Sequence, residues 1–304
     1  MTSMHSSLQP VAARRFAPAK VVTAGVVPPV QLREATFRRL SALVRDSCGI
    51  SLAPSKRLML QTRLGRRLRA KGLEDFDAYA ALLTGDNPPP AEMQAFIDCV
   101  VTNETSFFRE QPHFDHLTVQ RLHALASQGG QGHLAMWSAA CSTGEEVWTM
   151  AMVAANAAST EGGGWGWSIL ATDISITALA RARRGIYPVE ATGRVPSALA
   201  TQFLRRADTG PGMVSIIPEL RRNVRFGQIN LMDSRYMPGR LMDVIFLRNV
   251  LIYFDVETQV EIVRKLCMHL RPGGLLFLGH SDMSPEKQAP LRLLRNNIHE
   301  RLED

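Results

Sequence analysis

The sequence predicts an α/β fold built on a parallel, doubly wound sheet, preceded by an all-helical region. From residue 133 onward, apolar runs of strand length alternate with runs of helix length, and this alternation indicates a parallel sheet covered by helices. From Phe37 to Leu83, apolar residues instead recur at steps of three and four, as they do along helices. A chain of 304 residues is long enough for one large domain and a smaller one.

Residues 1–33 contain no acidic side chain, and the first carboxylate is that of Glu34. They show no helical period, and no long apolar stretch follows their basic residues, so a signal peptide is not indicated. Four prolines interrupt the amphipathic helix that an organellar transit peptide needs. We therefore expect a disordered basic tail.

The helical domain is expected at residues 34–101. Its first helix closes at Gly49, and its second spans Lys56 to Lys71. A break rich in Gly and Pro at 84–90 precedes a short helix, Ala91–Val101.

The α/β domain is expected at residues 133–304, after a linker and lid segment at 102–132. The candidate strands are Leu134–Ala140, Trp167–Thr172, Val224–Gln228, Val244–Leu247 and Leu275–Gly279. The candidate helices are Glu145–Ala158, Ile176–Arg184 and Thr258–Leu270, the last ended by Arg271-Pro272-Gly273-Gly274. The region 186–223 interrupts the alternation with short β-like runs around glycines, which indicates a small antiparallel insert.

The turn between the first strand and first helix of this domain is the most informative stretch. It reads Ala140-Cys141-Ser142-Thr143-Gly144-Glu145-Glu146. A strand, a turn of small residues and a helix begin a nucleotide-binding α/β domain. The turn has one glycine where a dinucleotide pyrophosphate needs three, and its carboxylates make a poor phosphate cradle. The pattern favours a nucleoside-like ligand without phosphate and with positive charge, and S-adenosylmethionine fits that description.

Asp173 ends the second candidate strand. A carboxylate at this place lies over the ligand crevice of such a fold and can accept both ribose hydroxyls. The alternative is that Asp173 caps the helix starting near Ile176, which Asp does well. Because Gly144 lies one strand–helix unit upstream, ribose binding is the favoured interpretation.

Further polar residues lie where such a sheet binds ligands. The segment Asn103-Glu104-Thr105-Ser106-Phe107-Phe108-Arg109, between the two parts, suits a loop that folds over a ligand, although paired aromatics are more often core. Arg248, Asn249 and Tyr253 follow the fourth strand, and Asn230-Leu231 follows the third, so both groups are placed at the crevice. The alternative for the residues after the fourth strand is apolar core, with Tyr253 a buried phenol.

Several classes of function lack support. The four cysteines lie far apart with no C-x-x-C pair, which favours reducing cytosol over a zinc site or a disulfide framework. The eight histidines lack metal-ligand spacing, and no serine or cysteine lies in a nucleophile-elbow context, so hydrolase chemistry is not indicated. No apolar run approaches the roughly 18 residues of a membrane span.

The second helix carries charge of one sign. Its basic residues are Lys56, Arg57, Arg63, Arg66, Arg67, Arg69 and Lys71, with no acidic residue among them. Leu60, Leu64 and Leu68 supply its buried stripe, so we expect the arginines on the outer faces. Solvated faces usually mix signs, and a helix of one sign predicts an anionic partner: nucleic acid, a membrane surface or an acidic protein.

These segments together resemble the CheR-type methyltransferases, which act on bacterial chemoreceptors. The matching pieces are Gly49-Ile50 with Lys56-Arg57, Asn103-x-Thr105-x-Phe107-Phe108-Arg109, Ala140 to Glu146, Ala171-Thr172-Asp173, Asn230-Leu231, Arg248-Asn249-Val250-x-Ile252-Tyr253-Phe254 and Gly279-His280-Ser281. They occur in order over about residues 34–285, and the series is highly specific.

The resemblance implies a Rossmann-like methyltransferase domain with a small antiparallel β-subdomain, preceded by an all-α domain. It implies a cytoplasmic protein-glutamate O-methyltransferase that takes the methyl group from S-adenosylmethionine, releases S-adenosylhomocysteine and esterifies glutamates of chemoreceptor helices. It also implies that Arg109 and Tyr253 hold the substrate carboxylate. The implied cofactor residues are Asn103, Thr105, Arg109, Ala140, Gly144, Glu146, Asp173, Asn230, Leu231, Arg248 and Asn249. The implied receptor-binding residues are Lys56, Arg57, Arg63, Arg66 and Arg67.

Some points stay open. Certain members dock a receptor tether peptide on a loop of the β-subdomain, and the long, glycine-bearing loop 205–212 allows it here. A non-catalytic receptor scaffold or cofactor sensor is one rival function. A nucleic-acid methyltransferase is a weaker rival, because no aromatic residues for base stacking interleave the basic helix. We expect no nucleic acid, no metal and no membrane insertion, and nothing demands more than a monomer.

Overall fold

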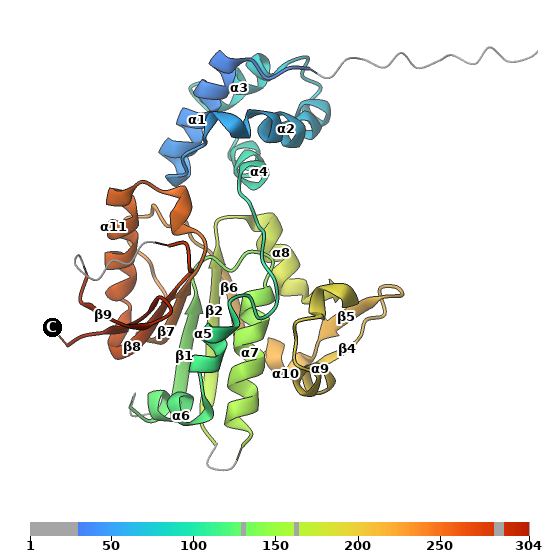
Figure 1. Cartoon of the computed structure of the whole chain (residues 1–304). Helices are drawn as coiled ribbons and strands as arrows, with labels where there is room; N and C mark the ends of the chain where they lie inside the picture. The colour runs from blue at the N-terminus through green and yellow to red at the C-terminus, as the bar shows by residue number, and fades with distance from the viewer. Residues whose placement is uncertain (1–29, 129–131, 161–163, 283–288, 304) are drawn as a thin grey trace, which may run out of the picture.

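The computed structural model describes residues 30–128, 132–160, 164–282 and 289–303. Figure 1 shows a helical domain at one end of the molecule and a larger α/β domain, from which a small sheet projects to one side. This architecture confirms the predicted fold class. Residues 1–29, which make up most of the expected tail, lie outside the described residues.

Within residues 30–101, four α-helices pack around one apolar core. They are α1 (Glu34–Cys48), α2 (Arg57–Lys71), α3 (Phe76–Thr84) and α4 (Pro90–Val100), with a 3₁₀ turn, η1 (Pro54–Lys56), before α2. Leu40, Leu64 and Phe96 are fully buried between them. Gly49, with φ of 74°, ends α1 as the sequence predicts, because a left-handed residue interrupts the helical hydrogen bonds.

The main sheet of the described residues has seven strands in the order β6-β2-β1-β7-β8-β10-β9. Their bounds are β1 (His133–Ser138), β2 (Gly166–Asp173), β6 (Val224–Gln228), β7 (Met242–Leu247), β8 (Leu270–Leu278), β9 (Leu291–Arg295) and β10 (Ile298–Arg301). The first five strands in that order run parallel, which confirms the five predicted strands.

A C-terminal hairpin makes the sheet mixed, and this corrects the expectation of a purely parallel one. β10 pairs antiparallel with β8, and β9 pairs antiparallel with β10. Asn296 and Asn297 form the turn with φ of 47° and 58°, a conformation typical of tight hairpins. These strands are short and partly polar, so alternation alone did not reveal them.

Two apolar clusters cover the two faces of the sheet. One contains side chains of α5 (Gln111–His116), α6 (Val119–Gln128), α7 (Glu145–Ala158) and α8 (Ile176–Arg184). The other contains side chains of α11 (Val256–Cys267), which follows the 3₁₀ turn η3 (Leu251–Tyr253). The segment 102–132 therefore contributes two helices to the core of the α/β domain.

The predicted end of the last helix is wrong. Asp255 caps α11 by accepting a hydrogen bond from the backbone N–H of Thr258, so the helix starts two residues earlier than expected. It ends at Cys267, and the segment 271–274 belongs to β8 instead. Gly273 has φ of 72°, and the pairing of β7 with β8 shifts register nearby. Gly273 and Gly274 thus lie in the irregular first part of β8.

The predicted antiparallel insert is confirmed. It contains β3 (Ile186–Pro188), η2 (Val189–Thr192), α9 (Ser197–Phe203), β4 (Leu204–Arg206), β5 (Met213–Ile216) and α10 (Pro218–Arg221). The strands form a sheet in the order β3-β5-β4, with both pairings antiparallel. In Figure 1 this β-subdomain stands beside α7 and α8.

Candidate functional site

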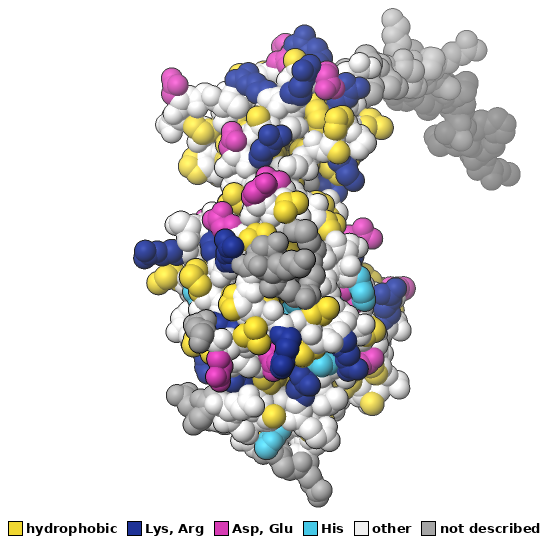
Figure 2. Space-filling view, turned by 60° about the vertical axis from the view of Figure 1, so that its left-hand side comes forward, with side chains coloured by type: hydrophobic (Ala, Val, Ile, Leu, Met, Phe, Trp, Pro, Cys, Tyr) yellow, Lys and Arg dark blue, Asp and Glu magenta, His cyan; other side chains and the backbone are white. Residues whose placement is uncertain are grey.

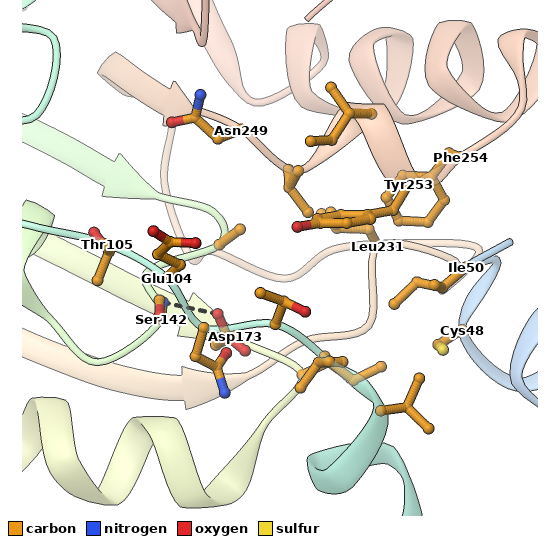
Figure 3. A pocket seen from close by; sticks show the side chains of 18 of the residues that line it. Cys48, Ile50, Glu104, Thr105, Ser142, Asp173, Leu231, Asn249, Tyr253 and Phe254 are labelled. Carbon is orange, nitrogen blue, oxygen red and sulfur yellow. Dashed lines mark hydrogen bonds between the residues drawn. The ribbon is translucent and has the colours of Figure 1, made fainter. Parts of the chain in front are cut away.

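A cavity of about 470 Å³ opens at the carboxyl ends of the parallel strands and is closed on one side by the N-terminal domain (Figure 3). Its volume is typical of small-molecule sites. The residues after β1, β2, β6 and β7 line it together with the loop before α2 and the segment after α4. The predicted cofactor residues that line it are Asn103, Thr105, Arg109, Ala140, Glu146, Asp173, Asn230, Leu231, Arg248 and Asn249.

Asp173 joins the ends of the first two strands. Its Oδ2 accepts a hydrogen bond of 2.8 Å from the backbone N–H of Ser142, drawn in Figure 3, and its Oδ1 accepts one of 2.9 Å from that of Ser175. Burial raises the pKa of the Asp173 carboxyl, and these backbone donors oppose the rise. The cap of α8 is Ser175, whose Oγ accepts from the N–H of Ala178, so the capping alternative for Asp173 is wrong.

Arg248 pairs with Glu146 on the wall of the cavity. The guanidinium Nη1 lies 3.2 Å from Glu146 Oε2, and Ser138 Oγ donates to Glu146 Oε1 at 2.8 Å. The Arg248 side chain is only 2% exposed, and its guanidinium stacks near the rings of Phe114 and Phe246. Burial raises the pKa of the Glu146 carboxyl, while Arg248 and Ser138 act in the opposite direction.

Glu110 is a charged residue at this site that the motifs did not single out. It lies behind the cavity wall at the start of α5, with φ of 56°. Its Oε2 accepts from Arg248 Nη2 at 3.1 Å, and its Oε1 accepts from Asn249 Nδ2 at 3.0 Å and from the backbone N–H of His280 at 3.3 Å. The available signal was its place directly after Arg109.

Asn249 is held in a left-handed conformation, with φ of 57°. Its backbone N–H donates to Asp282 Oδ2 at 2.8 Å, and the same oxygen accepts from the N–H of Gly279 at 2.7 Å. A Cβ on Gly279 would lie 2.6 Å from Asn249 Nδ2, so no other residue fits there without displacement. The Gly279-His280-Ser281 motif therefore supports Asn249 from behind.

Arg109 and Tyr253 reach the cavity from segments that lie far apart in the sequence. Arg109 donates from Nη1 to the carbonyl oxygen of Glu104 at 2.9 Å, which folds the segment after α4 over the site. Tyr253 lies on η3, and in Figure 3 its hydroxyl points into the cavity. Both side chains line this cavity, and their role in holding a substrate carboxylate stays a prediction.

Gly144 does not line the cavity but permits close packing beside it. It has φ of 98°, and a Cβ there would lie 2.7 Å from Tyr187 Oη and 2.8 Å from the Cα of Ala182. The glycine thus lets the start of α7 approach α8 and β3. The close packing of α7 against α8 and β3 is therefore one reason for a glycine at this position of the motif.

The N-terminal domain forms part of the site. Asn230 Nδ2 donates to the carbonyl oxygen of Ser47 at 2.7 Å, and the N–H of Ser51 donates to the carbonyl oxygen of Tyr253 at 3.0 Å. Cys48 and Ile50 line the cavity and face Tyr253 and Leu231 across it (Figure 3). Apart from Ile50, which belongs to a matching motif, these contacts had no sequence signal.

The basic helix α2 is less uniform than its sequence indicates. Figure 2 shows Lys and Arg side chains on the N-terminal domain, at the top of the view, with acidic side chains between them. Lys56, Arg57 and Arg66 are exposed, although Arg57 Nη1 lies 3.2 Å from Glu34 Oε2. The expectation that all the arginines lie on outer faces is wrong for Arg63 and Arg67.

Arg63 and Arg67 turn toward α4. Arg63 Nη1 donates to the carbonyl oxygens at the end of α4, those of residues 99, 100 and 101. Arg67 Nε donates at 2.9 Å to Oε1 of Glu92, a carboxylate only 1% exposed. Tyr79 Oη and Lys71 Nζ also lie 2.9 Å from Glu92 oxygens. These groups hold α2, α3 and α4 together.

The described residues contain no cluster of His, Cys, Asp and Glu that could hold a metal ion. Within the same part of the chain, no helix combines the length and apolar character needed to cross a bilayer. Burial raises the pKa of Cys48 and Cys267 to about 11, which leaves these thiols protonated and unreactive at neutral pH.

Two family models match the chain. The model described as "CheR methyltransferase, all-alpha domain" matches residues 35–101, and "CheR methyltransferase, SAM binding domain" matches residues 103–298.

Curated relatives agree. The chain is 42% identical over 252 residues to the chemotaxis protein methyltransferase of Salmonella typhimurium, covering 83% of this chain and 84% of that protein. Its match to the Escherichia coli protein of the same name is 42% identical over 252 residues and covers 83% and 85%. Chemotaxis protein methyltransferase 2 of Pseudomonas aeruginosa is 40% identical over 250 residues, or 81% and 85%. A solved magnesium protoporphyrin IX methyltransferase from Synechocystis with bound SAM aligns over 76% of this chain and 85% of that chain at 14% identity, with a TM-score of 0.34.

Proposed function

The chain belongs to the CheR methyltransferase family, and we propose that it esterifies glutamate side chains on the helices of chemoreceptors. The family and the names of the relatives support S-adenosylmethionine-dependent methylation in chemotaxis. We further assign the glutamate carboxylate as the acceptor, the chemoreceptor as the partner, and roles to individual residues. The observation that carries it is the meeting of Asp173, Arg109 and Tyr253 at one cavity.

The cavity fits S-adenosylmethionine. The Asp173 carboxylate accepts backbone N–H groups, among them those of Ser142 and Ser175, and as an ionised carboxylate with about four acceptor sites it can also accept ribose hydroxyls. Ser142 Oγ is buried without a hydrogen-bond partner among the described residues, and Ser142 lines the same cavity. The carboxylates of Glu146 and Asp173 suit a ligand with positive charge. We infer that the lining residues predicted from sequence, with Ser142 added, hold the cofactor.

The chemistry requires positioning more than proton transfer. Bound S-adenosylmethionine supplies an electrophilic methyl group on a positively charged sulfur. The acceptor is a glutamate with an ordinary pKa of about 4.3, so it is ionised at neutral pH and needs no general base. Arg109 grips one carboxylate oxygen through its guanidinium without exchanging a proton. Tyr253 donates a hydrogen bond to the other oxygen, and together they align it for in-line attack.

The partner follows from charge and position. Lys56 is exposed and lines the cavity, and Arg57 and Arg66 extend this basic surface along α2. An acidic receptor helix placed along α2 would present a glutamate to the cavity. The reaction needs a single copy of this chain, and the cytoplasmic receptor helices as substrate imply a cytoplasmic enzyme. Docking of a tether peptide at the β-subdomain stays a prediction.

Methyl transfer from radiolabelled S-adenosylmethionine to receptor-bearing membranes tests the proposal. We expect label that mild alkali releases as methanol, because carboxyl esters are alkali-labile. Arg109→Ala should reduce the label far more than it weakens cofactor binding, because its guanidinium holds the acceptor carboxylate. Label stable to alkali would refute ester formation. Cofactor binding without receptor labelling would instead favour a sensor or another acceptor.

A further inference from the structure

Glu110, Arg248 and Glu146 form a chain of charges that starts behind the cavity and ends on its wall. The guanidinium of Arg248 lies 3.1 Å from Glu110 Oε2 on one side and 3.2 Å from Glu146 Oε2 on the other. Both carboxylate side chains are 12% exposed, and that of Arg248 is 2% exposed. Arg248 and Glu146 line the cavity, whereas Glu110 does not.

The network of Glu110, Arg248 and Glu146 contains two carboxylates but only one guanidinium. Asn249, Arg248 and the N–H of His280 together outweigh the effect of burial and lower the pKa of Glu110 to about 2, so it is ionised at neutral pH. His113 and His280 also face Glu110, and burial is the main cause that lowers the pKa of His113 to about 4, so it adds no positive charge there. The guanidinium of Arg248 is therefore shared between an ionised Glu110 and Glu146.

We propose that Glu110 is a positioning residue that fixes Arg248 and Asn249. By pairing with Arg248 it partly neutralises the guanidinium, so that more of the negative charge of Glu146 acts on the cationic cofactor. Without Glu110, Arg248 would pair with Glu146 alone and neutralise it. S-adenosylmethionine carries one more positive charge than S-adenosylhomocysteine. Glu110 thus makes the pocket prefer the substrate form over the product. The inference rests on the proposed placement of the cofactor in this cavity.

The test compares the affinity of both ligands by calorimetry in matched variants. Glu110→Gln keeps the size and one oxygen but removes the charge, and it should weaken S-adenosylmethionine about tenfold more than S-adenosylhomocysteine, because only the former carries the positive charge that Glu146 attracts. Glu110→Asp keeps the charge, so the ratio of the two dissociation constants should return toward that of the unchanged protein. Glu219→Gln removes a charge from a residue that is 61% exposed and should change neither affinity.

Glu110→Asp keeps the inference testable if Glu110→Gln unfolds, because it retains the negative charge at this position. A folded Glu110→Asp protein that lost the preference for S-adenosylmethionine would show that the charge does not set this preference. Equal weakening of both ligands in Glu110→Gln would overturn the inference and assign Glu110 a purely structural role. An unaltered cofactor affinity in Asp173→Asn would instead refute the placement of the cofactor in this cavity.

Discussion

The carboxylate of Asp173 accepts the backbone N–H of Ser142 at 2.8 Å and so connects the loop after β1 with the end of β2. One hydrogen bond thus ties the sequence motif at 140–146 to the strand-end carboxylate. Both residues line the cavity, and the side-chain oxygen of Ser142 is buried without a partner among the described residues. The two halves of the proposed ribose site depend on each other.

Asp173→Asn should weaken S-adenosylmethionine binding tenfold or more, because its amide nitrogen would face a backbone N–H donor and one acceptor would be lost. Tenfold corresponds to about 1.4 kcal/mol. Asp75→Asn makes the same chemical change at the cap of α3, where Asn caps equally well, and should leave affinity unchanged. Calorimetric titration measures both. An unaltered affinity in Asp173→Asn would remove Asp173 from the cofactor site.

Arg66→Ala and Arg67→Ala should separate partner binding from stability. Arg67 pairs with the buried Glu92, so its loss should lower the free energy of unfolding by about 2–3 kcal/mol. Arg66 is exposed, and its loss should change stability by less than about 0.5 kcal/mol while weakening attachment to receptor membranes. Urea unfolding and membrane co-sedimentation report the two effects. Unchanged co-sedimentation of Arg66→Ala would argue against α2 as the receptor surface.

Gly49→Ala should disturb the domain junction and the cofactor site together. Gly49 has φ of 74°, and a Cβ there would lie 2.5 Å from Met232 Sδ and 2.9 Å from the ring of Phe254, which lines the cavity. Gly72 has a similar φ of 63° with nothing within 4 Å, so Gly72→Ala should cost only about 1 kcal/mol of backbone strain. We expect weaker cofactor binding in Gly49→Ala alone. Equal behaviour of both variants would show that the contact has no functional effect.

The contribution of Glu92 should depend on pH. Burial raises the pKa of its carboxyl, but hydrogen bonds from Arg67, Lys71 and Tyr79 outweigh it and lower the pKa to about 2 from an ordinary 4.5. A lowered pKa in the folded state means that the stabilisation is complete above about pH 4.5 and is lost as the pH falls toward 2. The difference in unfolding free energy between the unchanged protein and Glu92→Gln should therefore shrink from pH 5 to pH 3. A constant difference would refute the lowered pKa.

The sequence by itself determined the helical and α/β parts, the five parallel strands, the insert and the polar residues at the strand ends that line the cavity. It could do so because residues that follow parallel strands all emerge at one edge of the sheet. It also identified the family, because its motifs occur in order along most of the chain.

Only the tertiary structure decided which groups meet. Periodicity tells which side of a helix is apolar, but not that α4 lies beside α2 and binds Arg63 and Arg67. Glu110 and Arg248 are 138 residues apart, and no local pattern marks their pairing. The close approach of α7 and α8 at Gly144 is likewise a contact between elements that the motif does not reveal. A buried charge or a close approach is defined by its partner across the fold, and that partner exists only once the chain has packed.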